Sequence, residues 1–197
     1  MYLADRTFVS MATKNVYIAL LHYPVYNKKG DIVTTAVTNM DIHDISRAAR
    51  TYGAERFFIV TPIEKQQAFV KRILHHWQEG HGVLYNPSRK EAFDIVDTAG
   101  SLDDVIQNIA ERVGKKVRLV VTSATRQGSS VRFGDLREEI GRGNDAYLLA
   151  FGTGWGVSEE IIERADFVLE PITGPSDYNH LSVRSAVTVV LDRLCGK

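Results

Sequence analysis

The chain has 197 residues, 44% of them hydrophobic and 24% charged, which is the usual balance for a globular protein with one full core. Lys and Arg together number 24, as do Asp and Glu, and this zero net charge argues against a dominant nucleic-acid-binding surface, although a local basic patch can still exist. The single cysteine excludes an intrachain disulfide, and without a secretion signal it favours a reducing, cytoplasmic setting. Its longest apolar run is far too short to span a membrane.

Apolar runs and amphipathic stretches alternate along the chain. Residues 1–12 show no clear targeting signature, and we expect a loose leader there, followed by a single domain at 13–197. In chain order the predicted elements are a strand at 16–22, a turn at 27–30, an extended segment at 33–37, a helix at 41–52, a strand at 56–60, a helix at 64–78, a short strand at 80–85, helices at 88–97 and 101–113, a strand at 117–121, a polar loop at 122–130, a short helix at 134–141, strands at 146–150 and 167–170 with a helix from 158 between them, and a last helix at 182–194.

Capping residues support several of these helices. Asp41 is predicted as the N-cap of the first helix, which Gly53 ends, and Ser88 as the cap of the helix to about Asp97. Ser101 and Asp104 have the spacing of a capping box. In the helix at 64–78, the large apolar residues at helical spacing are Phe69, Ile73 and Trp77.

The pattern of these elements predicts an α/β fold. Strands alternate with helices, and nearly every strand is continuously apolar. Such strands belong to a mostly parallel sheet that helices cover on both faces. We therefore expect the loops at the carboxyl ends of the strands to form the binding edge.

The glycine-rich segment Gly152-Thr-Gly-Trp-Gly156 joins a predicted strand to a predicted helix. It lacks the third glycine of a dinucleotide fingerprint and the lysine of a P-loop. Glu159 and Glu160 would repel a phosphate, so a neutral or cationic ligand fits this loop better. The alternative is a tight turn that uses glycine for positive φ angles.

A second loop precedes the last helix. Pro171–Pro175 is rigid, and its backbone could contact the edge of a flat heterocycle. Asn179, His180 and Ser182 then present three polar groups; alternatively, Ser182 is only a helix cap and His180 a surface residue. In the last helix, polar residues fall on one stripe that we expect to be solvated: Arg184, Thr188 and Asp192.

Other candidate residues have strong structural alternatives. His22 ends the first strand, and Asp41 lies at the next helix start, where it could face the same edge or serve as a cap. His75 and His76 are adjacent on a helix and diverge, so no metal site is expected. A basic cluster that could hold RNA phosphates, or simply be surface, comprises Arg118, Arg126, Arg132 and Arg137.

Four segments resemble the SPOUT (trefoil-knotted) S-adenosylmethionine-dependent RNA methyltransferases, in particular a small bacterial branch related to the tRNA (guanine-N1) methyltransferases. They are His22–Gly30, Thr38–Asp44, Phe151–Gly156 and Tyr178–Ser185. The branch resemblance extends over almost the whole chain from Val16, and the general SPOUT pattern over about the last 80 residues. It implies a C-terminal trefoil knot, a homodimer and an RNA substrate, tRNA or rRNA.

The resemblance also implies which residues bind the cofactor, S-adenosylmethionine. Backbone groups of three loops and one turn would surround it, and these comprise Thr122, Ser123, Leu149, Phe151, Gly152, Thr153, Gly154, Leu169, Pro171, Ile172, Gly174, Asn179, His180, Leu181 and Ser182. Methyl transfer needs an aligned acceptor and often a base. The candidate catalytic residues are Arg126, followed by His22 and Asp41.

The sequence also departs from the tRNA (guanine-N1) methyltransferases, which carry an additional C-terminal RNA-binding domain. We therefore expect RNA recognition to depend on the dimer surface or on a partner. Two alternatives remain open: a non-catalytic nucleotide-binding or regulatory α/β module that retains the pocket, and a hydrolase on an unrelated open sheet. The second lacks a Gly-x-Ser-x-Gly elbow or a metal-ligand set.

Overall fold

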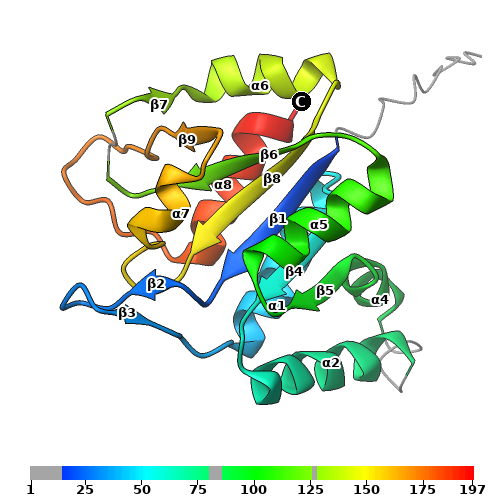
Figure 1. Ribbon diagram of the computed structural model, residues 1–197. Helices are drawn as coiled ribbons and strands as arrows, with labels where there is room; N and C mark the ends of the chain where they lie inside the picture. The colour runs from blue at the N-terminus through cyan, green and yellow to red at the C-terminus, as the bar shows by residue number, and fades with distance from the viewer. Residues whose placement is uncertain (1–14, 80–85, 126–127) are drawn as a thin grey trace, which may run out of the picture.

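The computed structural model describes residues 15–79, 86–125 and 128–197. It has a seven-stranded parallel sheet of order β5-β4-β1-β8-β6-β9-β7, with helices on both faces (Figure 1). The strands of the sheet are β1 (Val16–Leu21), β4 (Arg56–Val60), β5 (Val96–Ala99), β6 (Val117–Thr122), β7 (Ser130–Val131), β8 (Ala146–Gly152) and β9 (Phe167–Leu169). A separate antiparallel hairpin joins β2 (Val25–Tyr26) to β3 (Ile32–Val33). The predicted α/β class and parallel sheet are confirmed.

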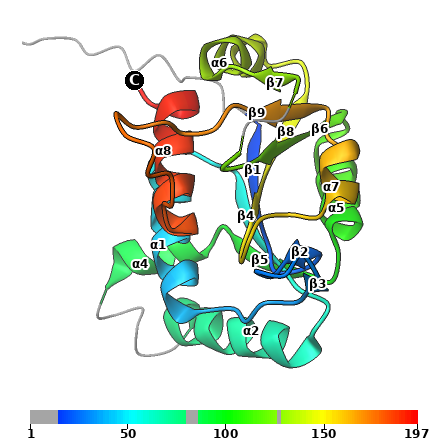
Figure 2. The same ribbon diagram turned by 90° about the vertical axis from the view of Figure 1, so that its left-hand side faces the viewer.

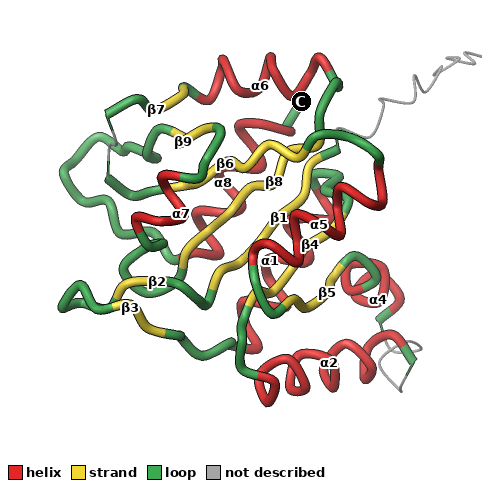
Figure 3. The backbone as a smooth tube through the Cα atoms, viewed as in Figure 1, coloured by secondary structure: helices red, strands yellow, loops and turns green. Residues whose placement is uncertain are grey.

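The helices divide between the two faces of the sheet (Figure 2). One face carries α5 (Leu102–Val113) and α7 (Glu159–Glu163). The core on the other face is completed by α1 (Asn39–Thr51), α2 (Glu64–Gln78), α4 (Pro87–Phe93), α6 (Phe133–Arg142) and α8 (Val183–Cys195). Figure 3 shows the same layers with the connecting loops.

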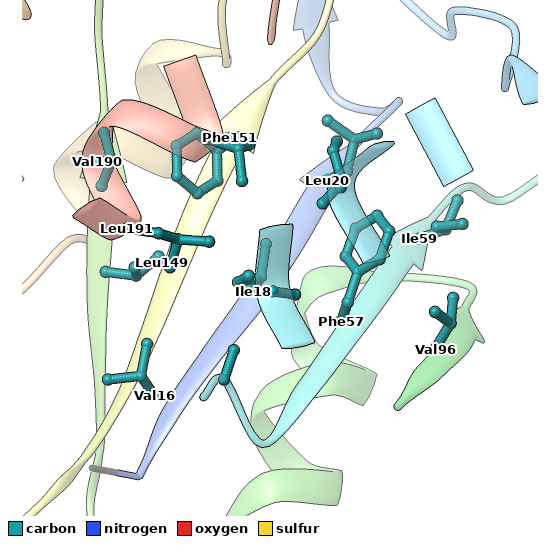
Figure 4. Packing of buried hydrophobic residues seen from close by; sticks show 14 of the residues in the cluster. Val16, Ile18, Leu20, Phe57, Ile59, Val96, Leu149, Phe151, Val190 and Leu191 are labelled. Atoms are coloured by element: carbon teal, nitrogen blue, oxygen red, sulfur yellow. The ribbon is translucent and has the colours of Figure 1, made fainter. Parts of the chain in front are cut away.

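The central strands are apolar throughout because both of their faces are covered. In β1, Ile18 and Leu20 point into one core, whereas Ala19 and Leu21 point into the other. Figure 4 shows the first core, in which side chains of β1, β4 and β8 form one cluster and those of β8 lie beside Val190 and Leu191 of α8. All six residues of β1 are buried, which explains why its sequence shows no polar alternation.

Several predicted boundaries were wrong. Thr38, not Asp41, is the N-cap of α1, because the Thr38 hydroxyl oxygen accepts from the Asp41 amide. Asn86, not Ser88, caps α4, and the chain leaves that helix after Phe93 to form β5, which was missed. The short strand β7 was also missed, because its two residues gain their pairing only from β9.

The buried residues of α2 also differ from the large apolar residues that the helical spacing indicated. Val70 and Leu74 are its buried residues, while Phe69 is 43% exposed. The capping box of Ser101 and Asp104 is confirmed on α5, as are the helices that begin after Ser158 and Ser182. The predicted leader at 1–12 and the predicted strand at 80–85 lie outside the described residues.

Candidate functional site: the carboxyl edge of strands β1, β8, β6 and β9

Four neighbouring strands bring the predicted loops to one edge. Leu21 of β1 is in register with Gly152 of β8, and Thr122 of β6 is in register with Leu169 of β9. Since these strands are parallel and adjacent in the order β1-β8-β6-β9, the loops that follow them emerge side by side. This confirms the predicted shared edge, at which open parallel sheets bind ligands.

Glycine is sterically required in the loop after β8. A Cβ on Gly152 would lie 2.7 Å from the Val157 amide nitrogen, so the loop folds back on itself at this point. Gly154 has a φ of +60°, and a Cβ there would lie 2.8 Å from the Tyr26 carbonyl oxygen. The positive φ of Gly154 agrees with a tight turn, and this turn also exposes backbone at the loop tip.

This loop is attached to the segment that follows β1. The Trp155 amide donates to the Tyr26 carbonyl at 2.9 Å, and the Tyr26 amide donates to the Gly156 carbonyl at 2.9 Å. The Ser158 amide donates to the Pro24 carbonyl at 3.1 Å. Backbone bonds thus hold the loop after β8 against the hairpin, while the Trp155 side chain is 65% exposed.

The predicted cofactor residues differ in which of their groups can face a ligand. Leu149, Phe151 and Leu169 are buried in the core, so only their backbone is available. Thr122 donates its hydroxyl to the Ala150 carbonyl at 3.1 Å, whereas Ser123 begins an exposed turn. In the loop after β9, Pro171 and Ile172 are half-buried and Gly174 is exposed.

The turn before α8 reaches the loop after β6. The Asn179 side-chain amide donates to the Ala124 carbonyl at 2.7 Å, which joins the two loops across 55 positions of sequence. The Ser182 hydroxyl oxygen accepts from the Ser185 amide, so Ser182 is a helix cap, as its alternative interpretation proposed. His180 and Leu181 are exposed.

Asp41 is a buried carboxylate with two partners. It accepts from the Thr38 hydroxyl at 2.6 Å and pairs with Arg184 Nη1 at 3.1 Å. Arg184 also pairs with Asp44 through Nε at 3.3 Å. The expectation that Arg184 lies on a solvated stripe was wrong, because its partners come from α1, a helix 130 or more positions earlier.

His22 is completely buried directly after β1. Burial lowers the pKa of its imidazole from 6.5 to about 4, and the carboxylate of Asp41 only partly opposes this change. His22 Nδ1 lies 2.9 Å from the Thr35 hydroxyl oxygen. Thr35 and Arg184 were not predicted as site residues, since no local pattern identifies partners so distant in sequence.

The predicted basic cluster is dispersed. Arg118 pairs with Asp145 at 2.7 Å and with Asp166 at 3.0 Å, at the beginning rather than the end of β6. Arg132 pairs with a neighbour on its own helix, and Arg137 donates to carbonyls at the end of α8. Arg126, the first predicted catalytic residue, lies outside the described residues.

The described residues contain no cluster of metal-ligating side chains. No group of three or more His, Cys, Asp or Glu residues within 15–79, 86–125 and 128–197 has a metal-binding arrangement. Across the same ranges, no helix is both long and apolar enough to cross a membrane.

The family model described as SAM-dependent RNA methyltransferase matches residues 15–196. The chain belongs to this family. Its match begins one residue before β1 and ends one residue after α8, so it includes every strand of the sheet and every loop of the carboxyl edge. Because this family is SAM-dependent, the cofactor of this protein is S-adenosylmethionine.

The chain is similar in sequence to an uncharacterized protein and to a tRNA methyltransferase. An uncharacterized protein of Aquifex aeolicus (strain VF5) is 42% identical, over 93% of this chain and 90% of its own length. A tRNA (guanine-N(1)-)-methyltransferase of Oleidesulfovibrio alaskensis is 39% identical over 93% of this chain. The alignment with that methyltransferase covers only 42% of the relative's length, so the chain corresponds to less than half of it.

Solved structures share the fold at low sequence identity. The SpoU methyltransferase AviRb of Streptomyces viridochromogenes, in complex with the cofactor AdoMet, superposes with a TM-score of 0.53 at 16% identity. The superposition covers 91% of this chain and 56% of AviRb. The seven-stranded sheet and its flanking helices therefore share the fold of AviRb.

Proposed function

We propose that this protein transfers a methyl group from S-adenosylmethionine to a nucleotide of tRNA or rRNA, and that it does so in the cytoplasm. The observation that carries the proposal is the convergence of the loops after β6, β8 and β9 at one edge, within a chain that belongs to the SAM-dependent RNA methyltransferases. Its relative from Oleidesulfovibrio alaskensis is named a tRNA methyltransferase, which supports an RNA acceptor.

The chemistry of the loops fits this cofactor. Glu159 and Glu160 occupy the first turn of α7, where their charge favours a sulfonium over a pyrophosphate. The tip of the loop at Gly154 is exposed backbone without a side chain, which suits close contact with an adenine or a ribose. We assign cofactor binding to the backbone of Gly152–Gly154, the loop after Leu169 and the turn at 179–182.

We propose that the segment after β9 threads through the loop after β6 as a trefoil knot. The hydrogen bond from Asn179 to Ala124 supports this path, because it joins the two segments just before α8 begins. Beyond Ser182, α8 packs against α1 on the face opposite α7 (Figure 2). A knotted path would hold the three cofactor loops in a fixed relation.

We propose a homodimer in which a second copy covers the carboxyl edge. Large apolar side chains are exposed on segments of that edge, with Met40 at 59%, Trp155 at 65% and Leu181 at 48%. Exposed side chains of this size and apolar character are available for contact with a second copy. Sedimentation tests this assembly, and a monomer at micromolar concentration would refute it.

Arg126 is our candidate for orienting the acceptor nucleotide, since its loop follows β6 at the binding edge. His22 and Asp41 are buried, so we assign them to supporting the loops rather than to contact with the acceptor. S-adenosylmethionine supplies an electrophilic methyl group. The protein's part is to align the acceptor and exclude water.

The test begins with calorimetric titration of the purified protein with S-adenosylmethionine, NAD and ATP. Selective micromolar binding of S-adenosylmethionine supports the proposal, and preference for NAD or ATP, or no binding, refutes it. Methyl transfer to bulk tRNA and rRNA is then measured. Arg126→Ala should retain cofactor binding and lose methyl transfer by orders of magnitude, while Arg132→Ala, an exposed arginine paired with Asp135, serves as the matched control.

A further inference from the structure

Three segments meet around the buried imidazole of His22. The His22 amide donates to the Val60 carbonyl of β4, and the His22 carbonyl accepts from the Thr35 amide, both at 2.9 Å. On the side chain, Nδ1 lies 2.9 Å from the Thr35 hydroxyl oxygen. Within residues 15–79, 86–125 and 128–197, Nε2 is buried and has no hydrogen-bond partner.

The hydrogen bonds continue from Thr35 into the loop after β8. The hydroxyl oxygens of Thr35 and Thr153 lie 2.5 Å apart, and the Thr153 hydroxyl is 3.0 Å from the Leu21 carbonyl oxygen. A chain of side-chain hydrogen bonds therefore runs from His22 through Thr35 to Thr153 and ends on the backbone of β1. We call this chain the His22 relay.

The direction of the relay follows from its last acceptor. A carbonyl oxygen only accepts, so Thr153 must donate its single hydroxyl hydrogen to Leu21. Thr153 then accepts from the Thr35 hydroxyl, and the Thr35 oxygen in turn accepts from His22. Nδ1 must therefore carry a hydrogen, and in a neutral imidazole this leaves Nε2 with a lone pair.

The relay ends on Thr153, whose hydroxyl group attaches the glycine-rich turn to neighbouring segments. Thr153 stands between Gly152 and Gly154, which contribute no side-chain contacts. Its amide also donates to the Leu21 carbonyl at 3.2 Å, and its hydroxyl is the second attachment to the same strand end. Without the hydroxyl bonds, Thr153 would be attached to the end of β1 by a single backbone hydrogen bond of that length.

We propose that His22 is a positioning residue for the cofactor, whose Nδ1–H acts through Thr35 and Thr153 to hold the Gly152–Gly154 backbone in its binding conformation. This inference rests on the proposed function. The inference gives a reason for the burial of a polar ring at the ends of β1 and β4. An apolar side chain of similar size could fill the same space, but it could not donate a hydrogen bond to Thr35. The inference also excludes direct proton exchange between His22 and a bound acceptor, since the ring is fully enclosed.

The test uses substitutions that separate the two ring nitrogens. His22→Asn places an amide nitrogen near the position of Nδ1, and His22→Gln places one near Nε2, while His22→Leu removes both donors. We expect His22→Asn to bind S-adenosylmethionine within about threefold of the unchanged protein. His22→Gln, His22→Leu and Thr153→Val should each raise Kd by roughly five- to tenfold, the usual effect of one lost hydrogen bond.

Kinetics and a double variant distinguish positioning from a general loss of stability. With saturating S-adenosylmethionine, kcat of the folded variants should stay within about twofold, because the relay sets cofactor binding rather than the chemical step. His22→Leu combined with Thr153→Val should bind no more weakly than either single variant, since both break one chain. Additive losses of affinity, or an unchanged Kd in His22→Leu, would overturn the inference.

The protonation of the ring can be measured without any variant. Long-range 15N–1H NMR of the full chain should show a neutral His22 with the hydrogen on Nδ1, and a hydrogen on Nε2 would overturn the relay. If the unchanged protein fails to bind S-adenosylmethionine, the proposed function fails and the positioning role with it. If the unchanged protein binds and the His22 and Thr153 variants bind equally well, only the inference fails.

Discussion

Acid should destabilise this protein through His22 in a way that one substitution can isolate. Burial lowers the pKa of His22 from 6.5 to about 4, so between these pH values the unfolded chain binds a proton that the folded chain does not. The free energy of unfolding therefore falls as the pH drops from 6.5 to 4. The difference between the two pKa values, at 1.36 kcal/mol per pH unit, corresponds to about 3 kcal/mol.

The assay is urea unfolding followed by circular dichroism, at several pH values from 7 to 4, for the unchanged protein and His22→Asn. The smaller side chain lowers stability at every pH, but it carries no titrating group, so the difference between the two curves isolates the protonation of His22. The unchanged protein should lose about 3 kcal/mol more than the variant across this range. His75→Asn, which removes an exposed imidazole on α2, is the matched control.

A flat difference curve would refute the reasoning, because it would mean that His22 takes up its proton equally in the folded and unfolded chains. Burial of the neutral ring would then be wrong, and with it the assignment of a lone pair to Nε2. An NMR titration of the His22 ring gives the same pKa directly, and a value near 6.5 in the folded protein would contradict the structure.

Three further substitutions should change the stability of the protein in predictable ways. Arg184→Ala should lower the free energy of unfolding, measured by urea unfolding, by about 3 kcal/mol, because it leaves the buried carboxylate of Asp41 without its cationic partner. Arg184→Lys should recover part of this loss, and equal stability of the two variants would contradict the pairing. Gly154→Ala should destabilise by more than about 1 kcal/mol, since φ is +60° and the new Cβ would lie 2.8 Å from the Tyr26 carbonyl oxygen, and calorimetry should show weaker binding of S-adenosylmethionine. Gly141→Ala, in the last turn of α6 with no atom within 4 Å of the new Cβ, should instead raise the melting temperature by an amount equivalent to about 0.5 kcal/mol, less than the full effect in a helix interior, and a decrease would show that the helix is not formed there.

The strands were predictable because their patterns are local. The segment at 16–21 is apolar over its whole length, and those at 56–60 and 117–121 are apolar except for Arg56 and Arg118 near their starts; such sequences are typical of strands covered on both faces. The edge strand β5 was missed because it carries Asp97 and Thr98 and follows a helix directly, so its local preference does not distinguish it from a continuing helix. Its pairing with β4 decides its conformation.

The binding edge was predictable in part for the same reason. Glycines in Gly152–Gly156 between a strand and a helix indicate a tight turn wherever they occur, and adjacent parallel strands bring their following loops together. The ion pair of Asp41 with Arg184 could not be predicted, because 143 positions separate its partners and either residue alone resembles a solvated surface group.

The amino-acid sequence by itself determined the class of fold, the parallel sheet, most helix positions and the family, since each depends on patterns within about 15 residues or on shared motifs. Tertiary structure alone decided which polar groups are buried and with whom. His22, Thr35 and Thr153 come from three separate segments, and their hydrogen bonds exist only because β1 and β8 end in register. The protonation of the imidazole follows from that burial, because the free energy of a charge depends on its surroundings and not on its neighbours in sequence.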